Sequence, residues 1–227
     1  NKAMKSIFFL SAVFVVLTGL LPHSDKNNGG KYQFILNADT IPASANIKAY
    51  SKYDFVPGEK VIGFEDFSTG SIGDFPVGWN TNGAGEIVTI EGKPGRWLWL
   101  TKPSVFVPEF TDKYPEDFTF EFDLLHGIIN GGGISVALVQ LDNIEQPQHW
   151  TLSGNRIHFQ LNNANTGGKT GDSKSTVRKN SENETANSIS TDLLSDAYNP
   201  LHVSIWQQKE RVRVYLNQEK IWDIPKG

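Results

Sequence analysis

The sequence contains no cysteine. Disulfide bridges, thiol catalysis, thiolate metal sites and a lipid anchor on cysteine are therefore excluded. Positive charge is also limited, since 21 Lys and Arg residues stand against 25 Asp and Glu residues and the formal net charge is −4. Because nucleic-acid binding needs a strongly basic face, a nucleic-acid partner is not expected. The longest apolar run is shorter than the ~20 residues of a membrane-spanning helix.

That apolar run covers residues 7–21, just after Lys5, and ends at Pro22. A positive residue followed by a short apolar stretch is typical of a secretory signal peptide. We therefore expect residues 4–21 to be a signal peptide that directs export to the periplasm or the outer membrane. A small-x-small cleavage pattern stands only at residues 43–45. The alternative is therefore an uncleaved N-terminal anchor that associates the protein with the membrane.

Residues 22–50 have the Asn, Gly, Ser and Pro content of a flexible linker. From residue 51 onward the apolar residues recur with a period of two, which predicts β-strands. Turn signals between short strands, with no long helical pattern, indicate a two-sheet antiparallel β-sandwich or jelly roll. We expect residues 51–227 to form one all-β domain of this kind.

The expected strands are short and separated by turns. They cover residues 60–67, 86–91, 96–100, 105–107, 118–125, 134–141, 201–207, 211–216 and 220–224, with two more pieces inside 151–161. The stretch 162–199 is rich in Asn, Ser, Thr, Gly and Lys. Because it has little apolar content, we expect a mobile loop there, with one weak strand at residues 175–178.

Residues 51–83, SKYDFVPGEKVIGFEDFSTGSIGDFPVGWNTNG, carry a resemblance to a known family. The blocks YDFVPGEK, FEDFS, GDFP and WNTNG are similar to the lectin-like region that precedes the OmpA-type peptidoglycan-binding domain in some outer-membrane proteins of Gram-negative bacteria. The later FTFEFDLL and RVRVYLN stretches resemble the same region. The resemblance implies a concanavalin-like jelly roll at the cell envelope, without a defined reaction. No OmpA-type domain is recognised in the 227 residues, so peptidoglycan binding through such a domain is not expected.

Glu121 and Asp123 are the best candidates for catalysis. They share one face of the expected strand 118–125, opposite its row of Phe side chains. Concanavalin-like endoglucanases carry an E-x-D-x-x-E strand motif, but His126 stands here in place of the final Glu. The simpler interpretation is the polar face of an amphipathic strand, and then Glu121→Gln should leave stability nearly unchanged. The nucleophile pattern G-x-S-x-G is absent.

Trp79, Trp97 and Trp99 are the residues expected to bind a ligand. Exposed aromatic rings can stack on the faces of sugars, whereas buried rings only pack in the core. Trp97 and Trp99 are two residues apart, so they share one face of their strand.

No metal centre or other cofactor is expected. Glu65, Asp66 and Asp223 near strand ends could supply oxygen ligands to a structural Ca²⁺, although their spacing matches no calcium motif. The sequence therefore favours a non-catalytic cell-envelope module that binds a glycan or an envelope protein. The alternative is a glycan-degrading glycoside hydrolase of the same fold.

Overall fold

The computed structural model describes residues 13–15, 53–101, 104–109, 114–125, 133–139, 156–164, 168–179, 182–195 and 199–225. The predicted linker at residues 22–50 lies outside the described residues. A three-residue strand, β1 (Val13–Val15), falls within the predicted signal segment and pairs with β5 and β7. Export by residues 4–21 stays a prediction.

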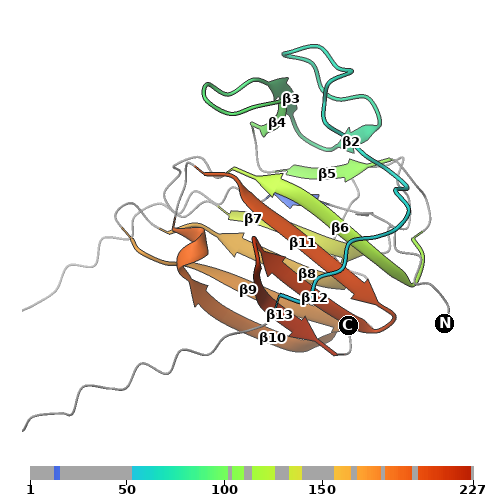
Figure 1. Ribbon diagram of the computed structural model, residues 1–227, viewed down its shortest axis with the longest axis vertical. Coiled ribbons are helices and arrows are strands. Elements are labelled where there is room, and N and C mark those ends of the chain that lie inside the picture. Colours follow the sequence, from blue (N-terminus) through green and yellow to red (C-terminus); the bar gives the residue numbers. More distant parts are fainter. Residues whose placement is uncertain are drawn as a thin grey trace, which may run out of the picture.

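The described elements are β-strands with one short 3₁₀ helix, and the strands form three antiparallel sheets (Figure 1). The largest sheet has the order β10-β9-β8-β7-β1-β5-β2, the second has the order β13-β12-β11-β6, and β3 and β4 form a separate pair. The predicted all-β sandwich is thus confirmed. The elements are β2 (Trp79–Thr81), β3 (Gly85–Val88), β4 (Trp97–Leu100), β5 (Ser104–Pro108), β6 (Asp117–Leu124), β7 (Gly133–Val139), β8 (Arg156–Asn162), β9 (Gly171–Lys179), β10 (Glu182–Thr191), η2 (Asp192–Leu194), β11 (Leu201–Gln208), β12 (Arg211–Leu216) and β13 (Glu219–Ile224).

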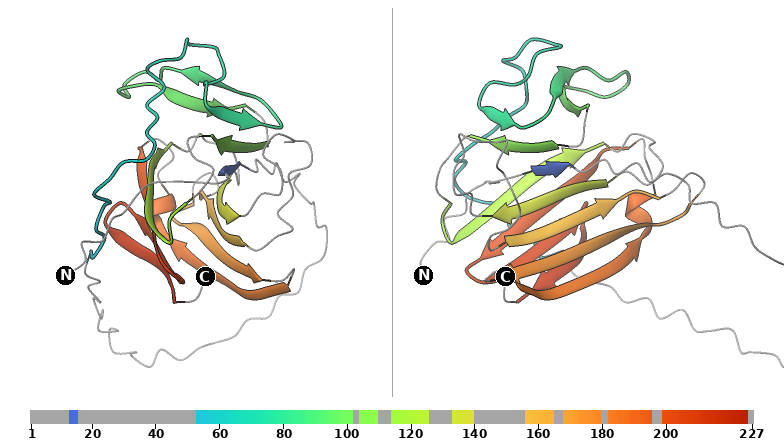
Figure 2. Two further views of the ribbon diagram at one scale, coloured as in Figure 1. Left: turned by 90° about the vertical axis from the view of Figure 1, so that its right-hand side faces the viewer. Right: turned by 180° about the vertical axis from the view of Figure 1, so that it is seen from behind.

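The core lies between the two large sheets, which Figure 2 shows as two stacked layers. Val203 and Ile205 of β11 point inward from one sheet, and Val136 of β7 and Phe159 of β8 point inward from the other. All four side chains are almost completely buried and belong to one apolar cluster. Burying a side chain of this size contributes roughly 1.5–3 kcal/mol, which is what holds the layers together.

Most expected strands are present with small changes at their ends. The strand predicted at 118–125 is β6, and the one predicted at 211–216 is β12 with the same bounds. The stretch predicted at 134–141 is β7 as far as the structure describes it, and its side chains are buried on both faces, as its few polar positions suggested. Of the two pieces predicted inside 151–161, β8 is the second, while residues 151–155 lie outside the described residues.

The prediction of a mobile loop at residues 162–199 is wrong, because β9 and β10 form an antiparallel hairpin there. The inward positions of β9 include two small polar residues, Ser173 and Ser175, and the apolar Val177, all of them buried. Ser173 Oγ accepts a hydrogen bond of 2.9 Å from the indole N–H of Trp222, which lies in the opposite sheet. A large ring thus packs over small residues, and the strand needs few apolar side chains of its own.

The prediction of a strand at residues 60–67 is also wrong. The segment has no regular strand structure, and Val61 and Phe64 are exposed, the latter at 76%. Glu65 accepts a hydrogen bond from the backbone N–H of Phe67, and Asp66 accepts one from that of Ser68. Such local side-chain bonds compete with strand pairing, so the alternating pattern forms turns instead.

Candidate functional site

His202 lies between the two carboxylates that the sequence marks as catalytic candidates. In the register of β6 and β11, His202 is the direct partner of Asp123, and Ser204 is that of Glu121. The Nδ1 atom of His202 lies 2.7 Å from Asp123 Oδ1, and its Nε2 atom lies 3.1 Å from Glu121 Oε2. The bond to Glu121 above all, with that to Asp123 and against the effect of burial, raises the pKa of His202 to about 9. At neutral pH the ring is therefore an imidazolium that donates from both nitrogens.

This contact changes the interpretation of Glu121. Glu121 and Asp123 share a strand face, as their spacing predicted, but each binds the same imidazolium through one oxygen. The Glu121 side chain is only 19% exposed, so Glu121→Gln should carry a measurable cost in stability rather than almost none. Reasoning from the sequence missed His202, because neither strand alone reveals its neighbour. His126 lies outside the described residues.

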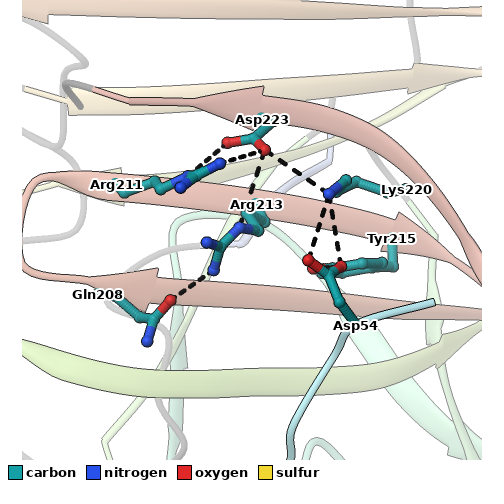
Figure 3. A network of polar contacts seen from close by, with 7 residues as sticks. All are labelled: Asp54, Gln208, Arg211, Arg213, Tyr215, Lys220 and Asp223. Carbon is teal, nitrogen blue, oxygen red and sulfur yellow. Dashed lines mark hydrogen bonds and ion pairs between the residues drawn. The ribbon is translucent and has the colours of Figure 1, made fainter. Parts of the chain in front are cut away.

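A second polar cluster covers β12 and β13 on the same outer face of this sheet (Figure 3). Arg211 donates two hydrogen bonds of 2.7 Å to the carboxylate of Asp223. Arg213 and Lys220 also approach Asp223, at 3.8 Å and 3.7 Å. The Arg211 bonds, with these further cations, hold the pKa of Asp223 below its usual range. The three cations of this group thus share the carboxylate of Asp223 as an ion-pair partner.

The segment before β2 crosses this face and is bound to it (Figure 1). Tyr215 donates a hydrogen bond of 2.8 Å to Asp54, which is the main reason that the pKa of Asp54 is lowered. The next residue, Phe55, packs against Trp206 and Tyr215 in edge-on ring contacts and forms a small buried cluster with them. This part of the sheet is therefore covered by the protein's own chain.

The three candidate tryptophans lie in different surroundings. Trp97 and Trp99 point to the same side of the β3–β4 hairpin, while Leu98 between them packs against the core. Trp99 is 57% exposed, and its direct partner across the hairpin is Glu86. Trp79 stands in β2, half-buried, with its ring 6.1 Å from that of Phe67. The structure thus brings Trp97 and Trp99 together and leaves Trp79 in a packing role.

The three carboxylates named for a structural Ca²⁺ have separate partners. Asp223 uses both oxygens for Arg211, and Glu65 and Asp66 bind backbone N–H groups in their own loop. Within the described ranges, no group of three or more His, Asp or Glu side chains is arranged to hold a metal ion.

Comparisons with family models, curated proteins and solved structures find no match for this chain. The resemblance to the lectin-like region stays a prediction. In the part of the chain that the structure describes, no helix is both long and apolar enough to cross a membrane. The class that the fold itself supports is an all-β sandwich.

Proposed function

We propose that the protein is a non-catalytic, glycan-binding module of the bacterial cell envelope, with Trp97 and Trp99 as its binding surface. The observation that carries this proposal is the exposed indole of Trp99, which lies beside Trp97 on one face of a hairpin. Flat exposed rings of this kind can stack on the apolar face of a sugar. Glu86, opposite Trp99, places a carboxylate where it can accept hydrogen bonds from sugar hydroxyls.

The location at the envelope is supported by the sequence. The apolar run at residues 7–21 has the length and position of an export signal, and the blocks at residues 51–83 resemble a lectin-like region of outer-membrane proteins. A concanavalin-like jelly roll, which that resemblance implies, is part of the proposal.

The contacts of Glu121 and Asp123 favour binding over hydrolysis. A retaining glycosidase needs two carboxyl groups about 5–5.5 Å apart that both face the sugar, one of them as proton donor. Here an oxygen of each carboxylate is bonded to His202, so neither carboxylate is free to face a glycosidic bond with both oxygens. The cluster is better suited to joining β6 to β11 than to transferring a proton to a leaving group.

The test compares binding by the wild type, Trp99→Ala and Phe64→Ala. Phe64 is a matched control, because it is also an exposed aromatic residue, at 76% against 57% for Trp99, and lies in the segment that precedes the hairpin. Binding to laminarin, lichenan and peptidoglycan is measured by calorimetry and by co-sedimentation. Loss of a stacking contact worth on the order of 1 kcal/mol should weaken binding about fivefold in Trp99→Ala and leave Phe64→Ala unchanged. An equal loss in both variants, or none in Trp99→Ala, would refute the proposed surface.

A reducing-sugar assay on the same glycans tests the alternative of hydrolysis. We expect no turnover by the wild type. Turnover that disappears in Glu121→Gln would replace the binding proposal with a glycoside hydrolase.

A further inference from the structure

The outer face of the seven-stranded sheet carries a group of basic side chains far along the chain from the tryptophan hairpin. In the register of β8 and β9, Arg156 lies directly opposite Arg178, and His158 lies opposite Thr176. On the other side of β8, Val139 and Ala137 are their partners, so no polar group comes from β7 at these two positions. The right-hand view of Figure 2 looks from behind, onto the side where β8 and β9 lie.

Several nitrogen atoms in this group are buried without a hydrogen-bond partner. They include Nε and Nη1 of Arg156 and Nε2 of His158. A buried N–H group that lacks an acceptor destabilises the folded state, and does so more when the group is charged. Native proteins rarely leave such donors unsatisfied, so their presence calls for an acceptor.

Burial and a neighbouring positive charge both disfavour the charged form of Arg156. Burial, and then the neighbouring charge of Arg178, lower the pKa of Arg156. Like charges directly opposite each other on neighbouring strands are destabilising. Burial, with the charge of Arg156, lowers the pKa of His158 to about 4, so its ring is neutral at neutral pH and can still donate from Nε2.

The strands next to Arg156 and His158 supply little negative charge, and the glutamates of the neighbouring β10, Glu182 and Glu184, lie beyond β9. Asp172 is the one acidic residue in β7, β8 and β9. It lies six residues from Arg178 along β9, roughly 20 Å away at the rise of an extended strand. Its carboxylate also accepts a hydrogen bond of 2.9 Å from Asn162. Asp172 is therefore too distant to accept a hydrogen bond from Arg156.

We propose that Arg156 and His158 form a binding site for an oxyanion, namely a phosphate, a sulfate or the carboxylate of an acidic sugar. Such a group offers several acceptor oxygens to the buried N–H groups of Arg156 and His158, and its negative charge complements the guanidinium of Arg156. Arg156 is only partly buried as a whole residue. The site lies on β8 and is separate from the hairpin proposed to bind neutral sugar faces.

The test measures the melting temperature of the full chain in sodium chloride and in phosphate, sulfate or glucuronate at matched ionic strength, with glucose as the uncharged control for glucuronate. A specific anion raises the melting temperature in a saturable way, as any ligand of the folded state does. Calorimetry with the same anions gives the dissociation constant. The three anions distinguish a phosphate or sulfate site from a sugar-carboxylate site.

The decisive variant is Arg156→Met, with Lys174→Met as the matched control. Lys174 is an exposed cation on the same face of β9. We expect Arg156→Met to bind the anion at least tenfold more weakly, and Lys174→Met to bind it as the wild type does. In chloride alone, Arg156→Met should melt no lower than the wild type, because a buried unpaired cation is replaced by an apolar side chain.

Other outcomes would overturn the proposal. They are a wild type that responds to none of the three anions, and an equal response in the wild type and Arg156→Met, which indicates a general salt effect. If Arg156→Met fails to fold, Arg156→Lys replaces it, since lysine keeps the charge and lacks the planar set of donors. An Arg156→Lys variant that binds as tightly as the wild type also contradicts the site.

Discussion

The contact of His202 with Glu121 and Asp123 predicts that alkaline pH destabilises this protein. Folding raises the pKa of His202 from 6.5 to about 9, so the folded state binds this proton more tightly than the unfolded state. The resulting stabilisation is fully present below pH 6.5 and is lost as the pH rises through about 9. At 1.36 kcal/mol per pH unit the rise corresponds to ~3 kcal/mol. The His202 side chain is 42% exposed, however, and solvent screening reduces the expected contribution to about 1 kcal/mol.

Urea denaturation of the wild type and of His202→Gln at pH 6, 8 and 10 tests this prediction. The free energy of unfolding of the wild type should exceed that of the variant by about 1 kcal/mol at pH 6, and the difference should almost vanish at pH 10. Other groups that titrate near pH 10 cancel in this difference. His158→Gln serves as the control, because folding lowers the pKa of His158 from 6.5 to about 4, so its effect on stability changes in the opposite direction, between pH 6 and 8, and is constant from pH 8 to 10. A difference between the wild type and His202→Gln that does not change with pH would refute the reasoning.

Two further predictions concern packing and the segment that crosses the sheet. Gly171→Ala should destabilise the protein by about 3 kcal/mol, because its Cβ would lie 2.6 Å from that of Leu194. Gly95→Ala should cost only ~1 kcal/mol, since Gly95 has a positive φ of 77° with open space around it; equal losses of unfolding free energy in urea would contradict this contrast. Tyr215→Phe should cost about 1 kcal/mol through loss of its bond to Asp54, and an unchanged melting temperature would show that this bond adds nothing.

Strands with a clear alternation could be located from the sequence. Residues 118–125 and 211–216 place apolar side chains at every second position, and both are strands in the structure, β6 and β12. The period of two follows from the geometry of a single extended chain, so it needs no knowledge of the neighbours. The same geometry correctly placed Glu121 and Asp123 on one face and Trp97 and Trp99 on another.

Alternation of apolar residues gave wrong predictions where contacts with other segments decide whether a strand forms. Residues 60–67 alternate but contain no strand, and their carboxylates bond to the backbone of their own loop. Residues 171–179 look like a polar loop but form a strand of the large sheet, between β10 and β8. Their inward Gly and Ser residues fit because Trp222 and Leu194 fill the space above them.

The sequence by itself determined the all-β class, the faces of the clear strands and the positions of the candidate carboxylates and tryptophans. Only the tertiary structure decided which strands are neighbours. His202 is 79 residues from Asp123 along the chain, and Asp54 is 161 residues from Tyr215, yet each pair is in direct contact. The physical reason is that side-chain alternation is a property of one strand, whereas pairing and packing depend on the complementarity of surfaces that are distant in sequence.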